Sequence, residues 1–159
     1  MKIEERLKEI LKGKVVIAGI GNILRGDDGF GPLFVNSLKN TSDFICIDCG
    51  TAPENYIGKV IKEKPDTVLL VDAVHLNAAC GSYELLKKED ILPSGFTTHD
   101  LSPNMLIEIL EKETNAVIYL LGIQPKNVTF GSEISEEVKN SLNLLVSAIN
   151  EVEKCMKHT

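Results

Sequence analysis

Short apolar runs without polar alternation constrain the fold of this chain more than any other feature. They lie at residues 15–20, 67–71 and 116–121. A strand that is apolar on both sides is buried on both faces, which is typical of a parallel sheet covered by helices. Helical patterns follow at residues 31–38, 56–64 and 103–112 and from residue 135 onward. This alternation predicts an α/β fold with three layers, α/β/α, around a mostly parallel twisted sheet.

Two further segments complete a five-stranded sheet. Residues 44–48 are predicted to form a strand, and residues 81–86 alternate polar and apolar side chains, which suits an edge strand that can run antiparallel. Apolar residues at helical spacing predict an extra N-terminal helix over about residues 2–12. We therefore expect residues 1–159 to form a single domain with this helix added before the first strand.

Composition narrows the class of protein. The net charge of −6 gives no electrostatic reason to expect nucleic acid as a partner. No stretch approaches the roughly 20 apolar residues of a membrane span, and the charged N-terminus does not resemble a signal peptide. We expect a cytoplasmic protein whose cysteines stay thiols.

Cys46 and Cys49 point to opposite faces of a predicted strand, which favours a structural role for both. A monomer is compatible with the sequence.

A glycine-dense loop between residues 19 and 31 follows the first predicted strand and carries Asp27 and Asp28. A dinucleotide-binding loop fits poorly, because two carboxylates repel phosphate, and a Walker loop is excluded by the lack of Gly-Lys-Ser or Gly-Lys-Thr. Nucleotide binding therefore remains a minor alternative. Taken alone, the two aspartates fit a solvated turn in which one side chain caps the following helix. Acidic loops at strand ends also hold cations.

Two other candidate ligands belong to the same edge of the predicted sheet. Asp72 ends the strand at residues 67–71, and His99 lies just before the helix at residues 103–112. Because parallel strands end on one side of a sheet, Asp28, Asp72 and His99 can converge on one divalent cation and leave coordination positions free. His75 also follows that strand, so the sequence does not rank it far below His99.

Five motifs are distributed along the chain: GIGNILRGDDGFGP from residue 19, DCGTAPEN from residue 48, VDA from residue 71, TTH from residue 97 and GIQP from residue 122. In their order and spacing, from about Lys14 to Cys155, they resemble the motifs of the nickel–iron hydrogenase maturation endopeptidases. The resemblance is closest to the branch that processes the large subunit of hydrogenase 3-type enzymes. The N-terminal helix and the two strand cysteines are departures from the family pattern.

The resemblance implies a function. Members of this family cleave a short C-terminal extension from the hydrogenase large-subunit precursor once nickel has been inserted. The family's nickel-contacting residues correspond to Asp28, Asp72 and His99, and the bound precursor would bring the nickel, so the resting enzyme can be metal-free. Asp27, Asp28 or Asp72 could accept a proton during hydrolysis of the peptide bond. The alternative is a nickel chaperone or scaffold that binds the large subunit without cleaving it.

Overall fold

The protein is described here by a computed structural model that covers residues 1–91 and 101–158. Its centre is a five-stranded sheet with the strand order β2-β1-β3-β5-β4. Strand β4 runs antiparallel to β5 at one edge and the other pairs are parallel, which confirms the predicted mixed sheet. The strands are β1 (Val15–Ile20), β2 (Ile45–Gly50), β3 (Thr67–Ala73), β4 (Tyr83–Leu86) and β5 (Val117–Ile123).

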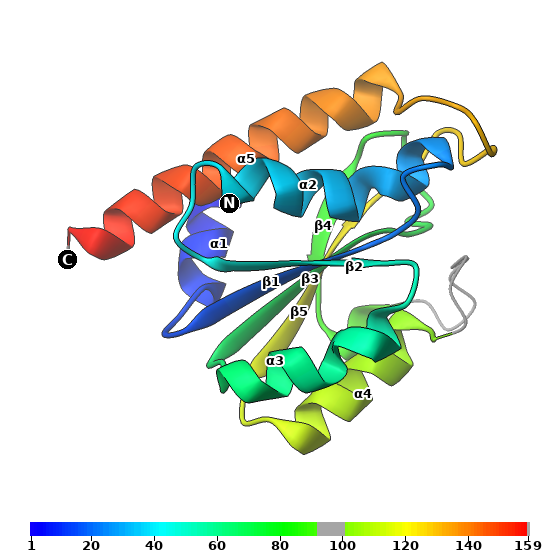
Figure 1. Cartoon of the computed structure of the whole chain (residues 1–159). Helices are drawn as coiled ribbons and strands as arrows, with labels where there is room; N and C mark the ends of the chain where they lie inside the picture. Colours follow the sequence, from blue (N-terminus) through cyan, green and yellow to red (C-terminus); the bar gives the residue numbers. More distant parts are fainter. Residues whose placement is uncertain (92–100, 159) are drawn as a thin grey trace.

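Helices cover both faces of this sheet, as predicted (Figure 1). One layer holds α1 (Ile3–Ile10), α2 (Phe30–Lys39) and α5 (Glu136–Lys157), and the opposite layer holds α3 (Ile57–Glu63) and α4 (Pro103–Glu113). Each layer packs its own hydrophobic cluster against the sheet. Cys46 packs against one cluster and Cys49 belongs to the other, which confirms that they point to opposite faces. Single turns of 3-10 helix occur at η1 (Gly26–Gly29), η2 (Pro53–Tyr56) and η3 (Lys88–Asp90).

The helix starts follow from their capping residues. The Ser102 hydroxyl accepts a hydrogen bond from Met105 N at the start of α4, and the Ser135 hydroxyl accepts one from Val138 N at the start of α5. Such caps satisfy backbone N–H groups that a helix leaves open at its N-terminus. Helix α5 is 22 residues long and buries one apolar stripe in the core. Neither it nor another helix in the described part of the chain is long and apolar enough to span a membrane.

The N-terminal helix α1 packs on the same face of the sheet as α5. Leu7 and Leu11 are fully buried there, and burial of a leucine side chain stabilises a fold by about 2 kcal/mol. The Arg6 guanidinium donates a hydrogen bond to the Leu85 carbonyl at 3.1 Å, which ties α1 to the edge strand β4. Helix α1 is therefore an integral part of the core.

The neighbouring parallel strands β1 and β3 are followed by connections that lead to opposite sides of the sheet. The chain continues from β1 to β2 at one edge, and from β3 to β4 and β5 on the other side. After β1 it enters α2 on one face, and after β3 and the edge strand β4 it reaches α4 on the other face (Figure 1). In open α/β sheets the crevice at such a switch point, beside the carboxyl ends of the strands, is where ligands bind. The residues that follow β1 and those at the end of β3 are therefore expected to form the functional site.

Candidate active site

Asp28 and Asp72 lie at this switch point. Asp28 is in η1, directly after the loop that leaves β1, and it is 3% exposed. Asp72 is the penultimate residue of β3 and is 1% exposed. The N–H of Asn22 donates to the Asp28 carboxylate at 3.1 Å. The interpretation of Asp28 as part of a solvated turn is therefore wrong, because the loop folds back over the strand ends and buries its carboxylate.

Close backbone packing joins the two acidic segments. A side chain carbon at Gly31, three positions after Asp28, would lie 2.5 Å from the carbonyl oxygen of Val71 and 2.3 Å from that of Ile20. Only glycine lets the start of α2 approach both strands so closely. The glycine therefore holds η1 against the end of β3, where Asp72 follows Val71.

Asp27 has a different role from its neighbour. Its carboxylate is fully buried and accepts hydrogen bonds from the backbone N–H groups of Lys126 at 2.8 Å and Asn127 at 3.2 Å. It also accepts hydrogen bonds from Ser135, from the N–H at 2.7 Å and from the hydroxyl at 2.8 Å. These donors occupy about as many lone-pair positions as a carboxylate offers. Asp27 therefore anchors the loop before α5, and the predicted solvated turn is wrong for this residue too.

The third predicted ligand, His99, lies outside the described residues. Helix α4, which begins four positions later at Pro103, starts at the edge of the sheet where β2 ends (Figure 1). Within residues 1–91 and 101–158, no group of three or more histidine, cysteine, aspartate or glutamate side chains is arranged to hold a metal. The structure therefore places Asp28 in η1 after β1 and Asp72 near the end of the neighbouring strand β3, and the complete trio remains a prediction.

His75, the alternative ligand, has contacts at both ring nitrogens. Nε2 lies 2.8 Å from the Asn77 side-chain oxygen, and Nδ1 lies 3.5 Å from Nε2 of Gln124. This pairing suits the neutral tautomer that carries its proton on Nε2. A metal ion at either nitrogen would have to displace one of these partners, so the contacts favour a structural role for His75.

Gln124 is a structural residue to which the sequence interpretation assigned no role. It follows β5, is 7% exposed, and its side-chain oxygen accepts a hydrogen bond from Leu76 N at 2.6 Å. Together with its contact to His75, this bond ties the segment after β3 to the end of β5. The sequence did contain a sign of this role, because Gln124 stands between a buried strand and Pro125. A polar side chain that is buried at such a place needs hydrogen-bond partners.

Burial makes the strand cysteines poor nucleophiles and poor metal ligands. It raises the pKa of Cys46 to about 11 and the pKa of Cys49 to about 12, the nearby Asp48 carboxylate adding to the effect at Cys49. The thiolate is the reactive form of cysteine, so both side chains remain inert thiols at neutral pH. Their structural role, predicted from the sequence, fits this chemistry.

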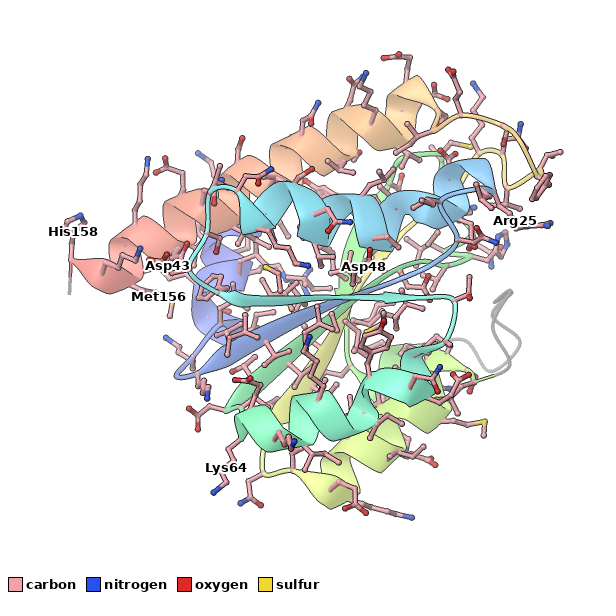
Figure 2. The ribbon with its side chains drawn as sticks, in the orientation of Figure 1. Arg25, Asp43, Asp48, Lys64, Met156 and His158 are labelled. Carbon is pink, nitrogen blue, oxygen red and sulfur yellow. The ribbon has the colours of Figure 1, made fainter. Side chains whose placement is uncertain are left out.

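The donor set at the switch point suits a hard or borderline divalent cation. Carboxylate oxygens bind such ions, and burial next to the strand ends strengthens any electrostatic attraction. Arg25 lies at the same edge of the sheet (Figure 2). Its Nε atom is buried and has no hydrogen-bond acceptor within the part of the chain that the structure describes. The edge thus combines two buried carboxylates with a guanidinium that can donate to a bound chain.

Comparison with known proteins identifies the family of this chain. Residues 33–152 match the family model of the hydrogenase maturation proteases. The hydrogenase 3 maturation protease of Escherichia coli K12 is 33% identical over 130 residues, which cover 80% of this chain and 83% of that protein.

Solved structures give the same result. The crystal structure of the NiFe hydrogenase maturation protease HycI from Thermococcus kodakarensis superposes with a TM-score of 0.85 at 34% identity, covering 94% of this chain and 99% of that one. The solution structure of the endopeptidase HycI from Escherichia coli gives a TM-score of 0.76 at 30% identity, with 85% and 88% covered. The family-model match, the sequence identity and the shared fold together show that this chain belongs to the hydrogenase maturation protease family.

Proposed function

We propose that this protein is the endopeptidase that removes the C-terminal extension of a nickel–iron hydrogenase large-subunit precursor after nickel insertion. The observation that carries the proposal is a pair of buried carboxylates, Asp28 in η1 after β1 and Asp72 near the end of the neighbouring strand β3. Membership in the maturation protease family supports the reaction type. The precursor, with its nickel, is the substrate.

Recognition in this proposal uses the nickel ion that the precursor carries. Asp28, Asp72 and His99 would contact the ion from the side opposite to the precursor's own ligands. Oxygen and imidazole donors without a thiolate bind such an ion moderately, so the protease can share the ion without removing it. A precursor without nickel would lack this part of the binding energy.

Hydrolysis needs a water molecule that attacks the scissile carbonyl and a group that takes up its proton. The carbon–nitrogen bond then breaks, and the departing amine receives a proton. Asp28 and Asp72 are the candidates for the proton acceptor, because a carboxylate can fill this role when it lies within hydrogen-bond reach of the water. Asp27, the third candidate from the sequence, has its oxygens occupied by backbone and hydroxyl donors.

Mass spectrometry of the precursor tests the proposal. The purified protein is mixed with nickel-loaded and nickel-free precursor, and loss of the C-terminal peptide is followed over time. We expect cleavage of the loaded form only, and a decrease of about 100-fold or more in the rate for Asp28→Asn, Asp72→Asn and His99→Ala. Asp90→Asn, an exposed carboxylate in η3, is the matched control and should cleave normally.

Each contrary result has a distinct meaning. A stable complex with an uncleaved precursor would identify a chaperone or scaffold instead of a protease. Equal cleavage of both precursor forms would contradict recognition through nickel while leaving the protease intact. Full activity of all three site variants would contradict the assignment of the site.

A further inference from the structure

We propose that Ile23, Leu24 and Phe130 form a docking surface for an apolar segment of the large-subunit precursor. We call these three side chains the apolar rim. They are 62%, 57% and 67% exposed. The inference rests on the proposed function, since it names the part of the protein that holds the substrate beside the acidic site.

The apolar rim is assembled from two loops that are far apart in the sequence. Ile23 and Leu24 follow β1, and Phe130 lies between β5 and α5. The N–H of Gly131 donates to the Leu24 carbonyl at 2.8 Å, and the N–H of Asp27 donates to the Asn127 carbonyl at 2.9 Å. Backbone hydrogen bonds thus hold the two loops together as one surface.

This surface is held in place and does not depend on a partner for its shape. Gly26 has a positive φ of +55°, and a side chain carbon there would lie 2.4 Å from both Asn127 O and Ser132 Oγ. The buried carboxylate of Asp27 also holds these two loops together, because it accepts hydrogen bonds from the N–H groups of Lys126 and Ser135. Large apolar side chains that are grouped and exposed on a fixed backbone mark an interaction site.

The position of the rim indicates which partner it meets. Ile23 and Leu24 precede Asp28 by only a few residues, and the hydrogen bond from Asn22 N to the Asp28 carboxylate closes the loop between them. A polypeptide that presents a bond to Asp28 would therefore lie close to this loop. Contact between the rim and apolar side chains of the precursor would remove both from water.

Arg25 supplies a polar contact within the same loop. Its Nε atom finds no acceptor in the residues placed by the structure, although it is buried. A buried donor without a partner is unfavourable, because it has lost its hydrogen bonds to water. Arg25 as a whole is partly exposed, so its guanidinium can donate a hydrogen bond to a backbone carbonyl of the docked precursor.

Binding and cleavage of nickel-loaded precursor test the inference with a double variant, Leu24→Ser and Phe130→Ser. Leu144→Ser in α5 is the matched control, because Leu144 is 49% exposed and lies on a different element. We expect the double variant to bind the precursor at least about tenfold more weakly and to raise KM by a similar factor. Its kcat at saturating precursor and its melting temperature should stay close to those of the unaltered protein.

Three results would overturn the inference. The first is a double variant that binds and cleaves like the unaltered protein, and the second is an equal loss in Leu144→Ser. The third is a dimer of the free protein, seen by sedimentation, that the double variant dissociates, because the rim would then pair two copies of this chain. Failure of the proposed function is distinguishable, since weaker binding by the double variant can be measured even if no precursor is cleaved.

Discussion

The carboxylate of Asp27 accepts hydrogen bonds from both the N–H and the hydroxyl of Ser135, at 2.7 and 2.8 Å, across 108 positions of the sequence. Ser135 is also the N-cap of α5, where its hydroxyl accepts a hydrogen bond from Val138 N. One buried side chain thus connects the loop after β1 with the start of the last helix. The adjacent Asp28 is thereby held at the switch point of the sheet.

Replacement of Asp27 by asparagine should lower the free energy of unfolding by about 3 kcal/mol. The amide directs N–H groups at backbone donors, so buried hydrogen bonds are lost without compensation. Urea unfolding followed by circular dichroism measures the change. Asp90→Asn, at an exposed position, should change the value by less than about 1 kcal/mol. A loss that small for Asp27→Asn would contradict the anchoring role.

Gly31→Ala should destabilise the protein by about 2 kcal/mol or more. The added carbon would meet backbone atoms of β1 and β3 at 2.3 and 2.5 Å, and a packed backbone cannot move aside cheaply. Gly58→Ala in α3 is the control, because a carbon there would contact nothing within 4 Å. Alanine also has the higher helix propensity, so this control should raise the free energy of unfolding by about 0.5 kcal/mol. Equal melting temperatures for both variants would contradict the close approach at Gly31.

Stability should decrease as the pH rises above about 9. In the folded state burial raises the pKa of Cys49 from 9.0 to about 12, so the folded protein keeps a proton that the unfolded chain releases. The stability that the protonated Cys49 thiol contributes is fully present below pH 9. As the pH rises from there toward the folded pKa, the free energy of unfolding decreases by about 1 kcal/mol per pH unit.

Denaturant titrations between pH 8 and pH 11 measure this dependence. Cys49→Ala should show a shallower loss of stability with pH than the unaltered protein, while Cys155→Ala, which removes an exposed thiol, should keep the same slope. If the free energy of unfolding fell equally steeply with pH in Cys49→Ala and in the unaltered protein, the raised pKa of Cys49 would be contradicted.

His75 and His99 should differ in their importance for cleavage. His75→Ala removes contacts to Asn77 and Gln124, so we expect slightly lower stability and a kcat/KM close to that of the unaltered protein. His99→Ala should lower kcat/KM by about 100-fold or more if its ring contacts the substrate's nickel. Cleavage assays on nickel-loaded precursor compare the two. A large loss of kcat/KM in His75→Ala together with little change in His99→Ala would identify His75, and not His99, as the residue that contacts the nickel.

The sequence alone was sufficient for the layered fold and for the placement of Asp72 at the end of a buried strand. Runs such as residues 67–71 are apolar on both sides, and this local pattern determines burial on both faces and hence the layered fold. Because parallel strands end at one edge, the position of Asp72 followed from the strand limits, whereas Asp28 lies in η1, eight residues after the end of β1. Strand β3 continues to Ala73, so Asp72 lies within the strand and not after it.

The roles of Asp27 and Asp28 could be separated only by the tertiary structure. The two residues are adjacent and chemically identical, and local pattern favoured a solvated turn for both. The partners of Asp27 lie 99 to 108 positions away, so its burial depends on how the loop before α5 packs. The same packing brings Phe130 beside Leu24. Strand burial is encoded by neighbouring residues, whereas hydrogen bonds between distant loops form only when the whole core is assembled.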